Sequence, residues 1–154
     1  MRRLEDNAWW LLLALAALCV VFGLGDLLGG APDNAQAVTG ETNTELAAQS
    51  GQAYRLIEVG VRAGGLQLIV IGALIATIVL FGFRRNLRWA WWSMWSIPMW
   101  TAAAVALHLA VGVSPGQTAP APVFSGSIVT VLTAGVLLVS RPRFFRRALA
   151  AEGP

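Results

Sequence analysis

Few side chains of this sequence could take part in chemistry, and most of them are found at Asp26, within residues 54–62 and at His108. Arg55, Glu58 and Arg62 are spaced by three and four residues, so on a helix they share one face and can form an ion-pair ladder. Charged groups inside a membrane are costly and are often functional. The sequence predicts an outer polar pocket, able to hold a small anion or a lipid headgroup, with these members: Asp26, Tyr54, Arg55, Glu58, Arg62 and His108. The alternative is a purely structural ladder, because long side chains near the membrane boundary reach water.

The residue inventory argues against most catalytic and metal sites. Cys19 is the only cysteine, so neither an intramolecular disulfide nor a CxxC motif exists. His108 is the only histidine, whereas zinc requires three or four ligands. We find no Ser-His-Asp set, phosphate loop or HExxH motif. We therefore expect no catalytic residue, metal or cofactor; an enzyme acting at the outer surface through Glu58, Arg62 and His108 is the weaker alternative.

Composition indicates an integral membrane protein. Of the 154 residues, 56% are hydrophobic and 12% are charged, about half the charged fraction usual in soluble domains. All eleven basic residues are arginines that cluster beside apolar runs, a pattern typical of membrane topology and not of nucleic-acid binding.

Four apolar segments reach the roughly 20 residues that a helix needs to cross a bilayer. We expect an all-α, single-domain bundle of four transmembrane helices with short loops, spanning residues 8–28, 59–83, 89–113 and 123–140. A polar outer loop joins the first two, and within it Thr42 and Glu45 form a capping box that predicts a short helix over residues 43–49. Cleavage of the first segment as a signal peptide, near the small residues 35–37, is an alternative that leaves the other three unchanged.

The arginines fix the expected orientation. Nine of them fall on one side of the predicted membrane: Arg2, Arg3, Arg84, Arg85, Arg88, Arg141, Arg143, Arg146 and Arg147. The positive-inside rule predicts a multi-pass protein of the cell membrane with both termini in the cytoplasm. Tryptophans 89, 91, 92, 95 and 100 follow the turn at residues 84–88 and suggest an interfacial anchor. Beside this anchor, Arg84, Arg85 and Arg88 could bind an anionic lipid.

Small residues predict where the helices pack. Stripes of glycine, alanine and threonine at four-residue spacing let helix backbones approach each other. Three such stripes occur: Gly60, Gly64, Gly72 and Ala76; Ala102, Ala106 and Ala110; Gly126, Thr130 and Ala134. Pro98 should kink the third helix and leave the carbonyl of Met94 without its donor.

The segment Phe83-Arg84-Arg85-Asn86-Leu87-Arg88-Trp89-Ala90-Trp91-Trp92, followed by Trp95 and Pro98, resembles small bacterial four-helix membrane proteins that share a basic turn and a Trp-rich third helix. In size and helix count these are similar to the DoxX-like group. The resemblance implies a location in the cell membrane and no particular activity, and it transfers no site residue to this chain.

Two functions fit the sequence. The first is a structural or accessory subunit of a membrane complex, since the chain is small, has short loops and carries no complete catalytic motif. The alternative is a subunit of a small-solute transporter or channel that acts as an oligomer. The expected partners are therefore the lipid bilayer, another membrane protein or a second copy of the chain.

Overall fold

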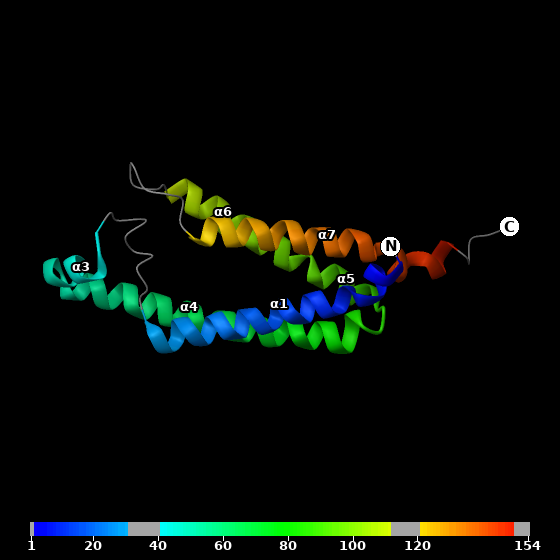
Figure 1. Cartoon of the computed structure of the whole chain (residues 1–154), viewed down its shortest axis with the longest axis horizontal. Coiled ribbons are helices and arrows are strands. Elements are labelled where there is room, and N and C mark those ends of the chain that lie inside the picture. The colour runs from blue at the N-terminus through cyan, green and yellow to red at the C-terminus, as the bar shows by residue number, and fades with distance from the viewer. Residues whose placement is uncertain (1, 31–40, 112–120, 150–154) are drawn as a thin grey trace.

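Two pairs of antiparallel helices make up the fold (Figure 1). The computed structural model describes residues 2–30, 41–111 and 121–149. Helices α1 (Arg2–Gly29) and α4 (Gly51–Ile78) form one pair; α6 (Ser96–Val111) and α7 (Ala121–Leu149) form the other. Three short elements complete the described part: α3 (Asn43–Gln49), the π-helical turn η1 (Val79–Phe83) and α5 (Arg88–Met94).

Three described helical segments are long and apolar enough to cross a membrane: Asn7–Gly29, Gly51–Phe83 and Val123–Phe145. They contain the predicted spans 8–28, 59–83 and 123–140. Two of the helices extend beyond these predicted spans: α4 begins at Gly51, and α7 continues beyond Ser140 through Pro142. The hydroxyl of Ser50 accepts a hydrogen bond from the Ala53 N–H at 3.3 Å, and this cap allows α4 to begin outside the apolar run.

The third predicted span, 89–113, is divided into two helices. α5 ends at Met94 and α6 begins at Ser96, with Trp95 between them. Pro98 has no N–H, so it cannot donate to the carbonyl of Met94. The backbone tightens at the break, where the Trp95 N–H donates to the Trp92 carbonyl, three residues earlier, at 3.1 Å. The predicted disturbance by Pro98 is confirmed, and it leaves α6 with 16 residues of its own.

The predicted capping box is present at the start of α3. The Thr42 N–H donates to Glu45 Oε2 at 2.7 Å, and the Glu45 N–H donates to Thr42 Oγ1 at 3.3 Å. The backbone N–H of Thr42, and then its hydroxyl, hold the pKa of Glu45 below its usual value because both donate to the charged carboxylate.

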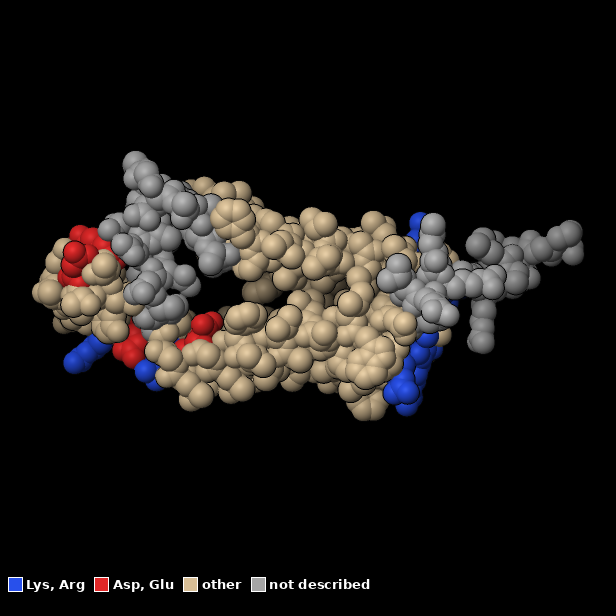
Figure 2. All heavy atoms as spheres, viewed as in Figure 1, with Lys and Arg blue, Asp and Glu red and all other residues tan. Residues whose placement is uncertain are grey.

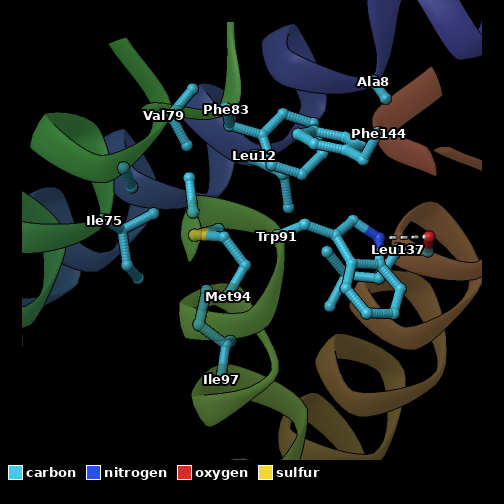
Figure 3. Packing of buried hydrophobic residues seen from close by; sticks show 12 residues of the cluster. Ala8, Leu12, Ile75, Val79, Phe83, Trp91, Met94, Ile97, Leu137 and Phe144 are labelled. Atoms are coloured by element: carbon cyan, nitrogen blue, oxygen red, sulfur yellow. Dashed lines mark hydrogen bonds between the residues drawn. The ribbon is translucent and has the colours of Figure 1, made fainter. Parts of the chain in front are cut away.

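The two helix pairs meet at one end, which we term the closed end: the N-terminal half of α1, η1, α5 and the C-terminal half of α7. The buried apolar core lies there, formed by Ala8, Leu12, Ala16, Ile75, Val79, Phe83, Ala90, Trp91, Met94, Ile97, Leu137 and Phe144 (Figure 3). At the other end, the open end, the pairs separate (Figure 1).

Trp91 ties α5 to α7 within this core. Its Nε1–H donates to the Leu137 carbonyl at 2.9 Å (Figure 3). Its ring meets the Phe145 ring edge-on, with the two centroids 5.3 Å apart. An interfacial-anchor role for Trp91 was therefore the wrong prediction, because the turn between η1 and α5 directs this indole into the protein. Its neighbours Trp89 and Trp92 are exposed, as an anchor requires.

The first pair packs backbone against backbone. A Cβ added at Gly65 would lie 2.6 Å from the Gly23 carbonyl oxygen, and one added at Gly72 would lie 2.7 Å from the Ala16 carbonyl oxygen. Only glycine permits this approach, and in lipid such close packing replaces the hydrophobic effect as the main source of helix association.

The second pair uses threonines and a glycine. The hydroxyls of Thr101 and Thr130 are 2.6 Å apart, and a Cβ at Gly126 would lie 2.7 Å from a methyl group of Val105. The predicted alanine stripe of α6 was wrong: Ala102, Ala106 and Ala110 are exposed. These alanines occupy a different side of α6 from Thr101 and Val105.

Candidate functional site: a cleft between the helix pairs

A cleft of about 480 Å³ opens between α4 and α6 where the two pairs separate. Figure 2 shows the molecule hollowed there. Three helices contribute its lining: Asp26 of α1; Ile57, Gly60, Val61, Gly64, Gln67, Leu68 and Ile71 of α4; Trp100 and His108 of α6. The volume falls within the range of small-molecule sites, roughly 300–1,000 Å³.

The rotation of α4 explains why glycines line this cleft. Steps of four residues advance about 40° beyond a full helical turn, so Gly60 and Gly72 point about 120° apart. α1 covers the side with Gly65 and Gly72, whereas a Cβ at Gly60 or Gly64 would meet no atom within 4 Å. The predicted single stripe from Gly60 to Ala76 was therefore wrong, because it serves two different sides of the helix.

One ring nitrogen of His108 forms a hydrogen bond within α6, and the other is available to a ligand. Its Nδ1 lies 2.7 Å from the carbonyl oxygen of Ala104, one turn earlier in α6. A carbonyl oxygen only accepts, so Nδ1 carries the proton of this hydrogen bond. In the neutral ring Nε2 is then a hydrogen-bond acceptor, and the side chain is half-buried at the cleft.

Asp26 and Gln67 are the other polar members of the lining. Within the described part of the chain, neither side chain makes a hydrogen bond or an ion pair. Asp26 is half-buried one turn before the end of α1, at the level of Gly65. Polar groups without partners are costly at membrane depth, and they mark candidate sites for a ligand.

Glu58 and Arg62 form the predicted ion pair but face away from the cleft. Arg62 Nη2 donates to Glu58 Oε1 at 2.7 Å. The pair lies against Gly30, where an added Cβ would be 3.4 Å from Glu58 Oε1 and 3.5 Å from Arg62 Nη2. Both side chains are partly exposed, at 31% for Glu58 and 48% for Arg62, so the pair is weakly stabilising.

The structure thus divides the six predicted pocket residues. Asp26 and His108 both line the cleft, and Glu58 and Arg62 pair with each other outside its lining. Tyr54 is half-buried and Arg55 is exposed, and neither reaches the lining. The lining carries one carboxylate and no arginine, so its charge differs from that of the pocket expected for an anion.

Sequence reasoning missed Gln67 and the role of Trp100. A signal for Gln67 existed: with Gly60, Gly64 and Ile71 it follows a spacing of four, three and four residues, which marks one side of a helix. Trp100 was grouped with the interfacial tryptophans, although it follows Pro98 and lies well beyond the basic turn.

The arginines of the closed end form a second polar region (Figure 2). The guanidinium of Arg84 lies over the ring of Trp9, 5.1 Å from its centroid, and that of Arg88 lies over Phe145 at 5.3 Å. These contacts hold the two arginines by cation–π attraction against α1 and α7. A shallow apolar groove runs along the adjacent helices, lined by Trp92, Ser93, Trp95, Ser96 and Met99.

The described residues contain no group of three or more His, Cys, Asp or Glu side chains suited to a metal ion. Comparison of the sequence with family models and with curated proteins gave no match, and comparison with solved structures gave none. The cleft must therefore be interpreted from its own residues.

Proposed function

We propose that the protein crosses the cell membrane four times, with both termini in the cytoplasm. α5 and α6 together rise about 36 Å from Arg88 to Val111, enough for a hydrocarbon core of about 30 Å. The gathering of arginines at the closed end, with acidic residues toward the open end, favours this orientation (Figure 2). Exposed Arg84, Arg85 and Arg88 are suited to anionic lipid headgroups on the cytoplasmic side.

Reporter fusions test this topology. A reporter that is active only outside the cytoplasm should give no signal when fused after Pro154 and should be active when inserted beside Asn43. Activity at Pro154 would overturn either the number of spans or the orientation.

Within this topology, the cleft binds a small solute, and the protein acts as a subunit of a small-solute transporter that works as an oligomer. One observation carries the proposal: the polar side chains Asp26, Gln67 and His108 line an otherwise apolar cleft. Polar groups at membrane depth gain stability when a partner satisfies them. A solute that enters from the open end supplies such a partner.

A second candidate is an accessory subunit whose cleft receives a transmembrane helix of another protein. The bare backbone at Gly60 and Gly64 favours it, because two glycines four residues apart allow a partner helix to approach closely. The two candidates differ in what covers Gly64 in the native membrane.

Cysteine labelling distinguishes them. In a Cys19→Ala background, Gly64→Cys is treated with a membrane-impermeant maleimide, first in native membranes from the outer side and then after purification in detergent. Labelling in both conditions supports an open solute cleft. Protection in membranes that is lost on purification supports a covering partner helix, and absence of labelling in both would refute an accessible cleft.

Two further positions calibrate the labelling. Gln49→Cys lies on α3, outside the proposed spans, and should react in both conditions. Leu74→Cys lies on the exposed side of α4 within its membrane-spanning segment. Lipid should protect this cysteine in membranes. If it reacts there, the reagent enters the lipid, and labelling does not measure access from water alone.

A further inference from the structure

The chemistry of the cleft narrows the class of solute it can hold. We propose that the cleft binds an amphiphilic organic ammonium ion, with the ammonium group at Asp26 and His108 and the apolar body against Trp100 and α4. This inference rests on the proposed solute-binding role and adds the charge and shape of the ligand.

The polar atoms that the lining offers to a ligand at Asp26 and His108 are hydrogen-bond acceptors, so the ligand must supply hydrogen-bond donors. The Asp26 carboxylate is an acceptor, and it has no partner among the described residues. His108 commits its Nδ1–H to the Ala104 carbonyl, so the neutral ring offers Nε2 as an acceptor. An ammonium group carries several N–H donors and is the complement of both acceptors, whereas a carboxylate or phosphate would add further acceptors.

The charges around the cleft also favour a positively charged ligand. Asp26 is the only ionised side chain of the lining when His108 is neutral. The nearest arginine of α4 on the neighbouring side, Arg62, is held by Glu58 at 2.7 Å and lies outside the lining. The cleft therefore presents a net negative charge to a ligand, which attracts cations and repels anions.

The rest of the lining suits an apolar body. Ile57, Val61, Leu68 and Ile71 form the wall on α4, and Trp100 lies on the opposite side, on α6. An indole also attracts organic cations through its π-face. A cleft of about 480 Å³ has room for a ligand of two or three fused rings or an equivalent branched chain.

Three probes with one shared ring system test the inference: 2-naphthylmethylammonium, 2-naphthylmethanol and 2-naphthoate. Each is measured by equilibrium dialysis against the full-length protein in lipid nanodiscs, with empty nanodiscs to subtract partitioning into lipid. The ammonium should bind at least about tenfold more tightly than the alcohol, because only the cation can form an ion pair with the Asp26 carboxylate. The naphthoate, which carries a negative charge, should bind most weakly.

Matched variants locate the site. Asp26→Asn keeps the shape and removes the charge, so it should lower ammonium affinity at least about tenfold, whereas Asp26→Glu should retain the preference for the cation. Glu45→Gln removes an exposed carboxylate of α3, outside the lining, and should change affinity less than about threefold, since an exposed charge is screened. Gly64→Leu places a large side chain in the cleft at a position where its Cβ would meet no atom within 4 Å, and it should abolish specific binding.

The outcomes separate the two proposals. If the alcohol binds as tightly as the ammonium and Gly64→Leu blocks both, the solute cleft stands and the ammonium inference fails. Wild-type affinity in Asp26→Asn would also overturn the inference. If none of the three probes binds above the empty-nanodisc control, the ammonium inference and the solute-binding role both fail.

Discussion

Replacing two adjacent glycines of α4 should give opposite results, although the sequence alone does not distinguish them. Gly65 packs against α1, and Gly64 faces the cleft. We expect Gly65→Ala to destabilise the fold and Gly64→Ala to leave it unchanged or slightly more stable. Because both changes replace a helical glycine with alanine, the intrinsic gain in helix propensity, up to about 1 kcal/mol, cancels in the comparison.

The magnitude follows from the contact with α1. A Cβ at Gly65 would lie 2.6 Å from the Gly23 oxygen and 2.7 Å from the Leu27 nitrogen, whereas ordinary contact begins at 3.4 Å. Both obstructing atoms belong to the backbone, so no side-chain rotation relieves the clash. α1 must move away by about 0.8 Å, and overpacking of this kind typically costs about 1–3 kcal/mol.

Reversible unfolding in mixed micelles measures the difference. SDS is titrated against each variant, and tryptophan fluorescence follows the transition, since the chain contains seven tryptophans. The free energy of unfolding of Gly65→Ala should fall about 1–3 kcal/mol below that of Gly64→Ala. If the two variants unfold within about 0.5 kcal/mol of each other, the close approach of α1 to α4 is not present in the folded protein.

Three further changes test separate contacts. Trp91→Phe removes the hydrogen bond to the Leu137 carbonyl and should lower the free energy of unfolding by about 1 kcal/mol or slightly more; an unchanged SDS midpoint would contradict that bond. Because the pKa of Glu45 is lowered in the folded state, its contribution to α3 should be complete above the ordinary value near 4.3 and disappear as the pH falls through the lowered pKa. Amide hydrogen exchange measures this, Glu45→Gln should remove the dependence, and a loss that begins above pH 5 would contradict it. Glu58→Ala and Arg62→Ala should show a coupling of about 0.3–0.5 kcal/mol in a double-mutant cycle, and full additivity would show that the pair does not interact.

Features set by a few neighbouring residues were predictable from the sequence. The capping box at Thr42 and Glu45 depends on two side chains and the backbone between them, so its spacing is sufficient. The break before Pro98 is likewise local, because proline lacks the donor that Met94 needs.

The direction in which each helix faces was not predictable. In a soluble protein apolar residues mark the buried side of a helix, but in lipid both sides are apolar, so the pattern carries little information on orientation. Trp91 therefore resembled its exposed neighbours in sequence, although it lies in the core. The spacing of Glu58 and Arg62 predicted their ion pair, but it did not show that this pair lies outside the cleft that His108 lines.

The pairing of helices that follow one another in the chain has a consequence for biosynthesis. α1 pairs with α4, the next long helix, and α6 pairs with α7, so each hairpin can close once its second helix has left the ribosome. Chains emerge at about 5–20 residues per second, so the glycine contacts of the first hairpin can form before Leu137 of the second hairpin has been synthesised. Docking of the hairpins at the closed end, where α1 touches α7, is then the last step of assembly. Two fragments divided within the turn at residues 84–88 should consequently insert as separate hairpins and recombine in the bilayer.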